Sequence, residues 1–337
     1  MPKLCVIPGD GIGQEVIPAA VRVLQAVIPD LDVVEADGGW DCFQRRGSAM
    51  PQETLDTVQA CGAALFGAVS SPSGPVAGYR SAILTLRQSL DLYANIRPVI
   101  GWPGVAPRPD VDIILVRENS EGLYLGRERT DGETAIAERV ITRRGSERIA
   151  RKAISLCQML GRRKLTIVHK ANVLPLTDGL FRDAVREMAA SMVAKGELEI
   201  NELLVDVAAL KMMGEPEVFD VVVTTNLFGD ILSDAAAYWG GGLGMAPSLN
   251  WGDQLGVAEP VHGSAPDIAG QGVADPTAAI LSGAMLARFV WEDALAADRI
   301  EAGVRRALAA NDGANVRGIT TNARLEQVLW GLDQAAT

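Results

Sequence analysis

Cysteine and histidine are scarce in this sequence. The chain of 337 residues holds two histidines and four cysteines: Cys5, Cys42, Cys61 and Cys157. No CxxC or Cys–His spacing occurs, which argues against a structural zinc site and favours reduced thiols in a cytoplasmic protein. The first residues show no basic segment followed by a sustained apolar run, and no stretch reaches membrane-spanning length. We therefore expect a cytoplasmic protein with no cleaved leader and no membrane partner.

Basic residues are outnumbered by acidic ones, 31 against 42, so that the net charge is −11 and the pI about 4.8. This balance argues against nucleic acid or an anionic membrane as the main partner. It leaves anionic small substrates open, because a local cluster of arginines can override the overall charge. Apolar residues make up 48% of the chain, enough for a substantial core in one large α/β domain or two lobes.

An apolar, β-branched run over residues 219–225 predicts a buried strand. Asn226 and Gly229 after it are interpreted as a turn. Asp230 and Asp234 follow, and a helix would place both carboxylates on one face. Oxygen ligands of this kind suit Mg²⁺ or Mn²⁺, whereas the alternative is a solvated helix start whose acids favour the macrodipole. The position between a strand and a glycine-rich segment favours a ligand site.

The N-terminal sequence predicts a short strand at residues 3–7, a tight turn over Gly9-Asp10-Gly11-Ile12-Gly13, and a helix from Glu15 onward. Such an arrangement is typical of dinucleotide binding. The Rossmann fingerprint nevertheless fails, because Gln14 stands where the third glycine is required. We interpret this turn as a loop near a ligand, outside a Rossmann fold.

Several cationic side chains lie near the ends of predicted elements. Arg87, Arg97 and Arg117 could hold carboxylates through paired hydrogen bonds, although any one of them alone is more often a surface residue. Lys170 stands two residues after the end of a predicted strand at residues 164–168, where the alternative is a solvated lysine. These positions make the four side chains candidates for a site that binds an anion.

The remaining pattern alternates strands and helices. Further strands are expected at residues 32–37, 63–69, 112–116 and 198–205, and helices in the first half of 81–98 and at 146–160, 178–195, 277–290, 298–310 and 322–333. Ser146 is the expected N-cap of its helix. Residues 125–145 are polar and irregular and could form a protruding strand pair or arm. Residues 259–270 are too rich in Gly, Pro and Ser for a helix or strand and predict a long functional loop.

Six motifs stand in the order found in one enzyme family: GDGIG, LDLYANIRP, VRENSEGLY, HKANVLPLTDGLF, TTNLFGDILSD and EPVHGSAPDIAG. The chain resembles the β-decarboxylating dehydrogenases, the family of isocitrate, 3-isopropylmalate and homoisocitrate dehydrogenases, over nearly its whole length. The resemblance implies an α/β fold of two lobes that share one long mixed sheet, and not a Rossmann fold. The first lobe, residues 1–98 and 252–337, would carry the cofactor-binding loop. The second, residues 99–251, would carry the arm and the dimer interface.

The resemblance also implies catalytic roles. Tyr124 matches the catalytic tyrosine that protonates the enol carbon. Lys170 matches the catalytic lysine that takes the hydroxyl proton, and it is supplied by the neighbouring subunit. Asp230 and Asp234 match metal-binding aspartates, joined by Asp206 of the other subunit, with Mg²⁺ or Mn²⁺ as the metal. The protein is therefore expected to be a homodimer or a higher homo-oligomer.

Two further sets of residues follow from the same motifs. The expected substrate-binding residues are Ser71, Arg80, Ser81, Arg87, Arg97, Arg117, Tyr124, Lys170 and Asn172. The expected cofactor-binding residues are Ile12, Asn172, His262, Gly263, Ser264, Ala265, Asp267 and Asp275. A carboxylate at Asp267 would repel a 2′-phosphate, so the resemblance favours NAD⁺ over NADP⁺. Asp275 replaces the asparagine usual in the family, and residues 315–319 replace its glycine-rich segment.

The identity of the substrate depends on the segment from Arg80 to Arg87. Ile83 stands where isocitrate enzymes carry Asn, and Arg80 stands where isopropylmalate enzymes carry an acidic residue. Arg80 or Ser81 would meet the distal carboxylate. The motifs RENSEGLY and HKANVLPLTDGLF look most like those of homoisocitrate dehydrogenases. We therefore expect homoisocitrate to be converted to 2-oxoadipate in lysine biosynthesis, with isocitrate as the second candidate and 3-isopropylmalate as the third.

A different class of protein stays open, namely a regulatory subunit that binds ligand without turnover. Such subunits typically lose metal or proton-transfer residues. Here Tyr124, Lys170 and the three aspartates Asp206, Asp230 and Asp234 are all present. The sequence therefore favours an enzyme.

Overall fold

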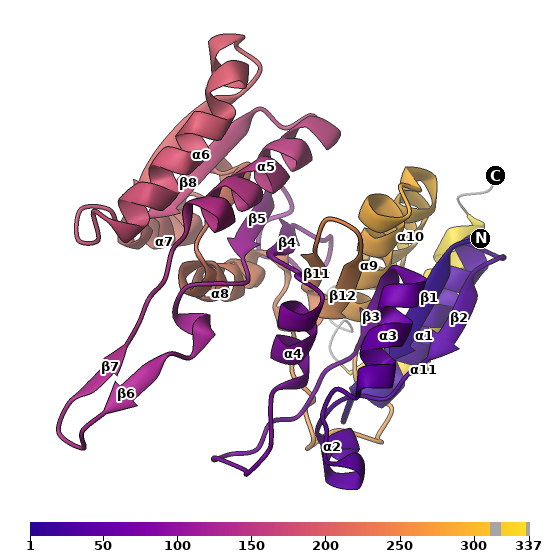
Figure 1. Cartoon of the computed structure of the whole chain (residues 1–337). Coiled ribbons are helices and arrows are strands. Elements are labelled where there is room, and N and C mark those ends of the chain that lie inside the picture. Colours follow the sequence, from indigo (N-terminus) through magenta and orange to yellow (C-terminus); the bar gives the residue numbers. More distant parts are fainter. Residues whose placement is uncertain (311–317, 335–337) are drawn as a thin grey trace. The chain divides into compact units, whose positions relative to one another are not determined.

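The computed structural model describes residues 1–310 and 318–334. Residues 315–317, part of the segment that departs from the family pattern, lie outside this range. The described residues hold a mixed sheet of ten strands together with helices, which confirms the predicted α/β class (Figure 1). The chain divides into two compact units. The first unit is Met1–Leu92, Gly101–Pro109 and Gly240–Thr337, and the second is Tyr93–Ile100 and Asp110–Trp239.

The first unit contributes five strands, in the order β2-β1-β3-β12-β11. Their bounds are β1 Lys3–Ile7, β2 Asp32–Glu35, β3 Ala63–Phe66, β11 Pro247–Trp251 and β12 Gly256–Pro260. Its helices are α1 Gly13–Val27, α2 Trp40–Arg46, α3 Gln52–Cys61, α4 Ala82–Ser89, α9 Thr277–Met285, α10 Ala294–Ala309 and α11 Thr321–Asp333. Short turns of helix at Leu243–Met245 and Leu286–Val290 complete it. All neighbouring strands run parallel except β11 and β12.

Helices cover both faces of these strands. Helix α9 contacts β11, β12 and α1, and α11 contacts α1 and α10. On the other face, Val58 of α3 and Leu86 of α4 pack with Ile7, Phe66 and Val257 in one fully buried cluster. The strands are apolar over most of their length because side chains on both faces are removed from water.

The second unit contributes the other five strands, in the order β4-β5-β10-β8-β9. Their bounds are β4 Ala94–Ile100, β5 Asp112–Glu118, β8 Lys164–His169, β9 Glu199–Leu204 and β10 Val221–Thr224. Its helices are α5 Arg143–Met159, α6 Thr177–Ala194, α7 Val205–Gly214 and α8 Asn226–Ala236, with short turns at Leu123–Leu125 and Pro216–Val218 and another at Ala237–Gly240. Helices α5 and α6 pack side by side on one face, and α7 and α8 on the other (Figure 1).

The register of the second unit gathers polar side chains at one edge. Strands β5, β10, β8 and β9 run parallel, with Thr224 beside both Arg117 and Val168, and His169 beside Leu204. The carboxyl ends of these strands therefore meet at the same edge, where open α/β sheets place their ligands. The segments that follow the strands begin at this edge and include Lys170, Asp206 and the start of α8.

The predicted arm is confirmed as a two-stranded antiparallel ribbon. Strands β6 (Glu128–Thr130) and β7 (Ala135–Ala137) pair over three residues each and extend away from the helices of the second unit (Figure 1). No described helix is long and apolar enough to cross a membrane.

Some predicted boundaries were wrong. Helix α5 begins earlier than expected, and its N-cap is Thr142, whose side chain accepts a hydrogen bond from the Gly145 backbone, whereas Ser146 lies buried inside the helix. Asn226 and Gly229 form no turn, because α8 begins at Asn226 itself. The long loop begins only after Pro260, since β12 includes that residue. In each case tertiary packing or a competing cap outweighed the local signal.

The carboxylate of Asp10 organises the glycine-rich turn after β1. Asp10 is 2% exposed and accepts hydrogen bonds from the backbone N–H groups of Trp40 (2.7 Å), Asp41 (3.0 Å) and Ser70 (2.8 Å). Trp40 and Asp41 open helix α2, so the buried acid caps this helix and ties it to the loop after β3. Asp10, the second residue of the turn, is therefore a structural anchor.

Replacing Asp10 with alanine is expected to lower the free energy of unfolding by about 3 kcal/mol, because three backbone N–H donors would lose the charged acceptor that a buried carboxylate provides. Denaturant unfolding followed by circular dichroism measures the change. The matched control is Asp56→Ala, which removes an exposed acid that bonds only to the Gln52 side chain among the contacts described, and should change stability by less than about 0.5 kcal/mol. Equal stabilities for the two variants would show that the cap is dispensable.

Candidate active site

Helix α8 carries the two predicted metal-binding acids on one face, as the spacing required. Arg97 on β4 contacts both: its Nη1 lies 2.6 Å from Asp234 Oδ1 and its Nη2 lies 3.4 Å from Asp230 Oδ1. The side chains of Asp230 and Asp234 are 33% and 51% exposed, and that of Arg97 is 10% exposed. The acids thus face solvent on one side and a buried cation on the other.

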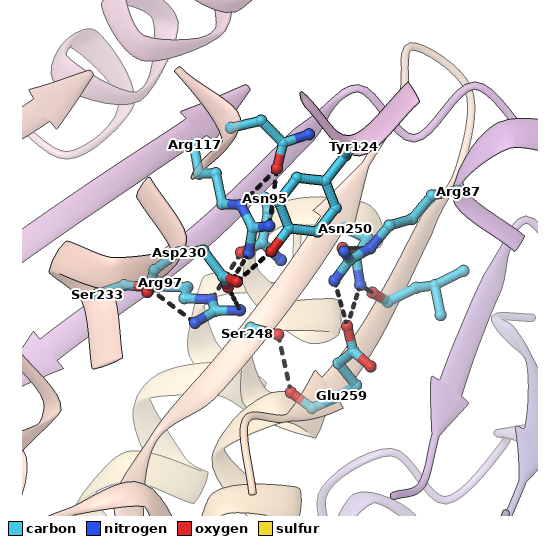
Figure 2. A network of polar contacts seen from close by, with 12 residues as sticks. Arg87, Asn95, Arg97, Arg117, Tyr124, Asp230, Ser233, Ser248, Asn250 and Glu259 are labelled. Carbon is cyan, nitrogen blue, oxygen red and sulfur yellow. Dashed lines mark hydrogen bonds and ion pairs between the residues drawn. The ribbon is translucent and has the colours of Figure 1, made fainter. Parts of the chain in front are cut away.

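Arg117 at the end of β5 provides the second cation. Its side chain is 1% exposed, and its Nη1 forms an ion pair with Asp230. Asn226 Oδ1 accepts from the Arg117 Nε and Nη2 atoms at 3.0 and 2.7 Å, and Asn95 Oδ1 accepts from Arg97 Nε at 2.7 Å. Buried amides therefore fix both guanidinium planes, and both guanidinium groups point toward Asp230 (Figure 2).

Gly229 allows Arg117 to approach α8 so closely. A Cβ atom at this position would lie 2.5 Å from Arg117 Cγ and 2.7 Å from its Cβ. Glycine within a helix costs conformational entropy, roughly 1 kcal/mol relative to alanine. Here the missing side chain makes room for the aliphatic part of the buried Arg117. This contact explains the glycine, which the sequence analysis interpreted as part of a turn.

Tyr124 lies in the short helical turn Leu123–Leu125, and its hydroxyl donates to Asp230 Oδ2. The Arg117 guanidinium lies 5.0 Å from the centre of its ring. Burial, and next the hydrogen bond to Asp230, raise the pKa of Tyr124 above its usual value. The phenol is therefore protonated at neutral pH and can act as a proton donor. Arg97, Arg117 and Tyr124 all point toward Asp230 in Figure 2.

Lys170 and Asp206 form a second charged group in the same unit. Lys170 follows β8, and its Nζ forms an ion pair with Asp206, whose pKa is lowered chiefly by this hydrogen bond. The sequence predicted a strand over residues 198–205, which would place Asp206 directly after a strand. In the structure Asp206 lies in the first turn of α7. Asn172 is exposed on the same turn as Lys170. Among the described residues no three His, Cys, Asp or Glu side chains come together in a group that could hold a metal ion.

The first unit holds the predicted cofactor-binding residues other than Asn172. The loop after β12 packs on the glycine-rich turn, where the Ile12 N–H donates to the Ser264 carbonyl at 2.9 Å and the hydroxyls of Ser264 and Ser70 lie 2.8 Å apart. Gly11 has φ +56°, and a Cβ there would lie 2.1 Å from the Ser264 carbonyl oxygen. Only glycine permits this contact, which joins two segments far apart in the sequence.

Two features of this loop are typical of a ligand site. Nε2 of His262 is buried without a hydrogen-bond partner among the described residues, and burial lowers the pKa of His262, so its ring is neutral at pH 7. Ala265 has φ +39°, a strained conformation for a residue with a side chain. Gly263 and Asp267 are exposed beside them. An unsatisfied buried nitrogen and local strain are typical of a site that a bound group completes.

Asp275 is already engaged by the protein. Its Oδ1 accepts from the Thr277 N–H at 2.9 Å, and its Oδ2 lies 3.2 Å from Nε of Arg324, a fully buried side chain at the start of α11. The predicted cofactor-binding acid thus joins the loop to helices α9 and α11. Its availability to a cofactor stays a prediction.

The remaining predicted substrate residues lie in the first unit. Arg87 is buried on α4, with its Nε 3.0 Å from Asn250 Oδ1 and its Nη2 3.1 Å from Glu259 Oε1. These two partners fix its orientation (Figure 2). Arg80 and Ser81 immediately precede α4, and Arg80 contacts only Gln88 among the contacts described, at 3.3 Å. Ser71 is exposed in the loop between β3 and α4.

Sequence reasoning missed the amides and hydroxyls that orient the cations. They are Asn95, Asn226 and Ser233 around the acid pair, and Asn250 around Arg87. Asn95 is two residues from Arg97 on the same strand, so period-two spacing could have placed both on one face. Asn226 was noticed only as a turn residue. Its partner Arg117 is 109 positions away, and no local pattern connects them.

The arrangement can bind a polyanion together with a cation. Two carboxylates one helical turn apart offer oxygen ligands only, which suit a hard divalent cation. Two buried arginines with fixed planes suit carboxylate groups. A protonated phenol at the same acids can donate a proton to a bound molecule.

Comparisons with known proteins agree with this chemistry. The family model for isocitrate/isopropylmalate dehydrogenase matches residues 3–328. An isocitrate/homoisocitrate dehydrogenase of Thermus thermophilus is 52% identical over 302 residues, 90% of this chain and 89% of that protein. A 3-isopropylmalate/3-methylmalate dehydrogenase of Methanocaldococcus jannaschii is 47% identical over 315 residues, 92% of each chain.

A solved structure shows the same fold. The crystal structure of isocitrate dehydrogenase from Methylococcus capsulatus superimposes with a TM-score of 0.92 and 40% identity, covering 98% of this chain and 99% of the other. The predicted fold, outside the Rossmann class, is thereby confirmed. The chain belongs to the isocitrate/isopropylmalate dehydrogenase family and is a β-decarboxylating dehydrogenase.

Proposed function

We propose that the protein oxidises and decarboxylates homoisocitrate to 2-oxoadipate with NAD⁺ and Mg²⁺ or Mn²⁺, a step of lysine biosynthesis. The observation that carries the reaction type is the convergence of Arg97, Arg117 and Tyr124 on Asp230, next to Asp234. Fixed guanidinium groups, a carboxylate pair and a phenol are what a hydroxy polycarboxylate needs for binding and proton transfer.

The divalent cation and NAD⁺ have definite places in this proposal. Asp230 and Asp234, with Asp206 of a second copy, would hold the divalent cation, which polarises the hydroxyl and carbonyl groups of the substrate when it is bound. The adenosine of NAD⁺ would lie at the loop of His262 and Ser264, and the nicotinamide accepts the hydride. Asp267 would bond to the ribose hydroxyls and disfavour a 2′-phosphate.

Proton transfers are assigned to two side chains of the protein. Lys170 would take the proton of the substrate hydroxyl as hydride leaves the same carbon, giving a β-keto acid. The bond to the β-carboxyl group then breaks, and its electron pair stays on the substrate as CO₂ departs. Tyr124 would give its proton to that carbon, which completes the balance of atoms and charge. Arg97 and Arg117 would hold the carboxylates and so keep the reacting carbon in place.

A homodimer is part of the proposal. Helices α7 and α8 contact each other and expose apolar side chains, with Leu210 75% and Ile231 60% exposed. The same helices carry Asp206 and the acid pair. An apolar surface beside these acids is suited to association of two copies. Asp206 of each copy would then join the acid pair of the other.

The choice of homoisocitrate depends on two arguments. Arg80 and Ser81 are positioned at the start of α4, ahead of the buried Arg87, and a distal carboxylate needs such partners. The 52% identical Thermus protein carries both substrate names, isocitrate and homoisocitrate. Isocitrate is the second candidate, and 3-isopropylmalate, favoured by the 47% identical relative, is the third. A regulatory subunit without turnover is the alternative of a different class.

The test is NADH formation by the purified protein with Mg²⁺ and each of the three hydroxy acids. We expect the highest kcat/KM for homoisocitrate, and a lower one when NADP⁺ replaces NAD⁺. A preference for isocitrate or 3-isopropylmalate would keep the mechanism and refute the substrate assignment. No turnover with any of them would favour the regulatory subunit.

Replacing Arg80 or Ser81 with alanine is expected to lower kcat/KM for homoisocitrate about 10-fold or more, because a bound carboxylate would lose a charged or hydrogen-bonded partner. The kcat/KM values for 3-isopropylmalate, which carries an apolar group instead, should change far less. Arg22→Ala is a control for Arg80, since Arg22 is an exposed arginine paired with Glu326. Unchanged kinetics in both variants would refute this assignment.

A further inference from the structure

The guanidinium of Arg139 joins three segments of the second unit. Arg139 follows the arm strand β7, and its Nη1 forms an ion pair with Asp178 and lies 3.0 Å from the Thr177 hydroxyl. Its Nη2 lies 3.0 Å from the Thr225 hydroxyl, and its Cζ lies 5.2 Å from the centre of the Phe228 ring. The side chain is 15% exposed. One cation thus contacts the start of α6 and the first turn of α8.

Asp178 transmits this contact to Lys170. Its side chain is completely buried, and its second oxygen accepts a hydrogen bond from the Lys170 backbone N–H at 2.6 Å. The Lys170 carbonyl in turn accepts from the N–H groups of Val173 (3.0 Å) and Leu174 (2.9 Å). Both backbone groups of the lysine are therefore fixed, and one of them depends on a carboxylate whose charge Arg139 balances.

The segment that carries Arg139 also adjoins the tyrosine turn. The Gly122 N–H donates to the carbonyl of Val140 at 2.9 Å in an isolated bridge, two residues before Tyr124. Arg139 is thus the neighbour of Val140, which pairs with the segment that leads to Tyr124. Arg139 also contacts the first turn of α8, the helix that carries the acid pair. The segments of one subunit that carry Lys170, Tyr124 and the acid pair are thus linked through this one side chain.

We propose that Arg139 and Asp178 are a positioning pair for the reaction: they fix the turn of Lys170 on its own subunit, so that the lysine is correctly placed for the site of the partner in the proposed dimer. The inference rests on the proposed function, because it assigns the pair to proton transfer by Lys170. Placement errors of about 1 Å at a catalytic group slow the chemical step by up to roughly 100-fold. Loss of the pair should therefore reduce kcat while substrate binding, which depends on other arginines, is retained.

The experiment compares Arg139→Met with Arg139→Lys, Asp178→Asn and the matched control Arg162→Met. Arg162 is also a largely buried arginine between two acids, 2.6 Å from Asp112 and 2.9 Å from Asp220, but these lie at the amino ends of the strands. Removal of either arginine should lower stability to a comparable degree. Only removal of Arg139 should affect the lysine turn.

For Arg139→Met we expect kcat to fall about 30-fold while KM for the hydroxy acid and for NAD⁺ changes less than about threefold. With substrate deuterated at the carbon that loses hydride, the isotope effect on kcat should rise, because the slowed step limits turnover. Arg139→Lys, which keeps the charge, should recover part of the loss. Arg162→Met should keep the kcat and the isotope effect of the wild type.

Two results would overturn the inference. One is wild-type kcat and isotope effect in Arg139→Met, and the other is an equal loss in Arg139→Met and Arg162→Met, which would mean general destabilisation. If Asp178→Asn does not fold, the two Arg139 variants decide the matter. Hydrogen–deuterium exchange of the peptide around Lys170 tests the pair without turnover: faster exchange in Arg139→Met than in Arg162→Met supports it, and equal exchange refutes it. An inactive wild type refutes the proposed function alone.

Discussion

Mixed dimers of two inactive variants, Lys170→Met and Tyr124→Phe, are expected to recover about a quarter of the wild-type activity. Each variant alone should lose roughly 1,000-fold in kcat, because each removes a proton-transfer group. Recovery follows if one subunit supplies Tyr124 and its partner supplies Lys170. In the structure Tyr124 bonds to Asp230, whereas Lys170 pairs with Asp206 in a separate group, as this assignment requires.

The expected fraction comes from counting sites. Unfolding and refolding an equal mixture gives about half heterodimers if association is random. In a heterodimer one site has both the tyrosine and the lysine, and the other site has neither. Half of the sites in half of the molecules are thus intact. The activity is measured as NADH formation after co-refolding, with wild type refolded in parallel as the reference.

Controls distinguish complementation from partial rescue. A mixture of Lys170→Met with Lys170→Ala should stay inactive, since no dimer then holds a lysine. If a mixture of the Lys170 and Tyr124 variants also stays inactive although heterodimers form, both residues serve the site of their own subunit. The shared-site part of the proposed function would then be wrong, while its reaction type would be unaffected.

Much of this arrangement could be predicted from the sequence because strong local signals mark it. Apolar runs located the strands that end near Arg117, Lys170 and the acid pair, and parallel strands bring their carboxyl ends together. The four-residue spacing of Asp230 and Asp234 placed both acids on one helical face. These predictions depend on periodicity within short segments, which a single sequence shows directly.

Other features could not be predicted because they join residues far apart in the chain. The partner of Arg139, the buried Asp178, is 39 positions away, and Asp10 bonds to groups 30 to 60 positions away. Nothing in the irregular stretch around residue 139 distinguishes this arginine from its exposed neighbours. Gly229 read locally is a turn residue, and only the buried stem of Arg117 explains it. Such roles appear once the packing of the segments is known.

Asp230→Asn is expected to cost far more stability than Asp234→Asn when no divalent cation is present. Asp230 accepts from Arg97, Arg117 and Tyr124, and both arginines are buried, so loss of its charge would leave buried cations without full compensation. Breaking a buried ion pair in this way costs about 3 kcal/mol or more. The substitution Asp234→Asn, at the more exposed acid, should lower the free energy of unfolding by about 1 kcal/mol or less. Calorimetric unfolding in EDTA measures the difference.

The same two variants test the assignment of the cation. A bound cation at 100 times its Kd would stabilise the wild type by about 2.7 kcal/mol, so its Tm should rise with added Mn²⁺. Both aspartate variants should lose this rise together with activity, because each replaces an anionic carboxylate ligand by a neutral amide. Asp56→Asn, at an exposed acid on α3, should keep it. A full rise of Tm in Asp230→Asn would place the cation elsewhere. The interaction with the arginines would then be the main role of Asp230, since a carboxylate held by two guanidinium groups is fully compensated without a metal.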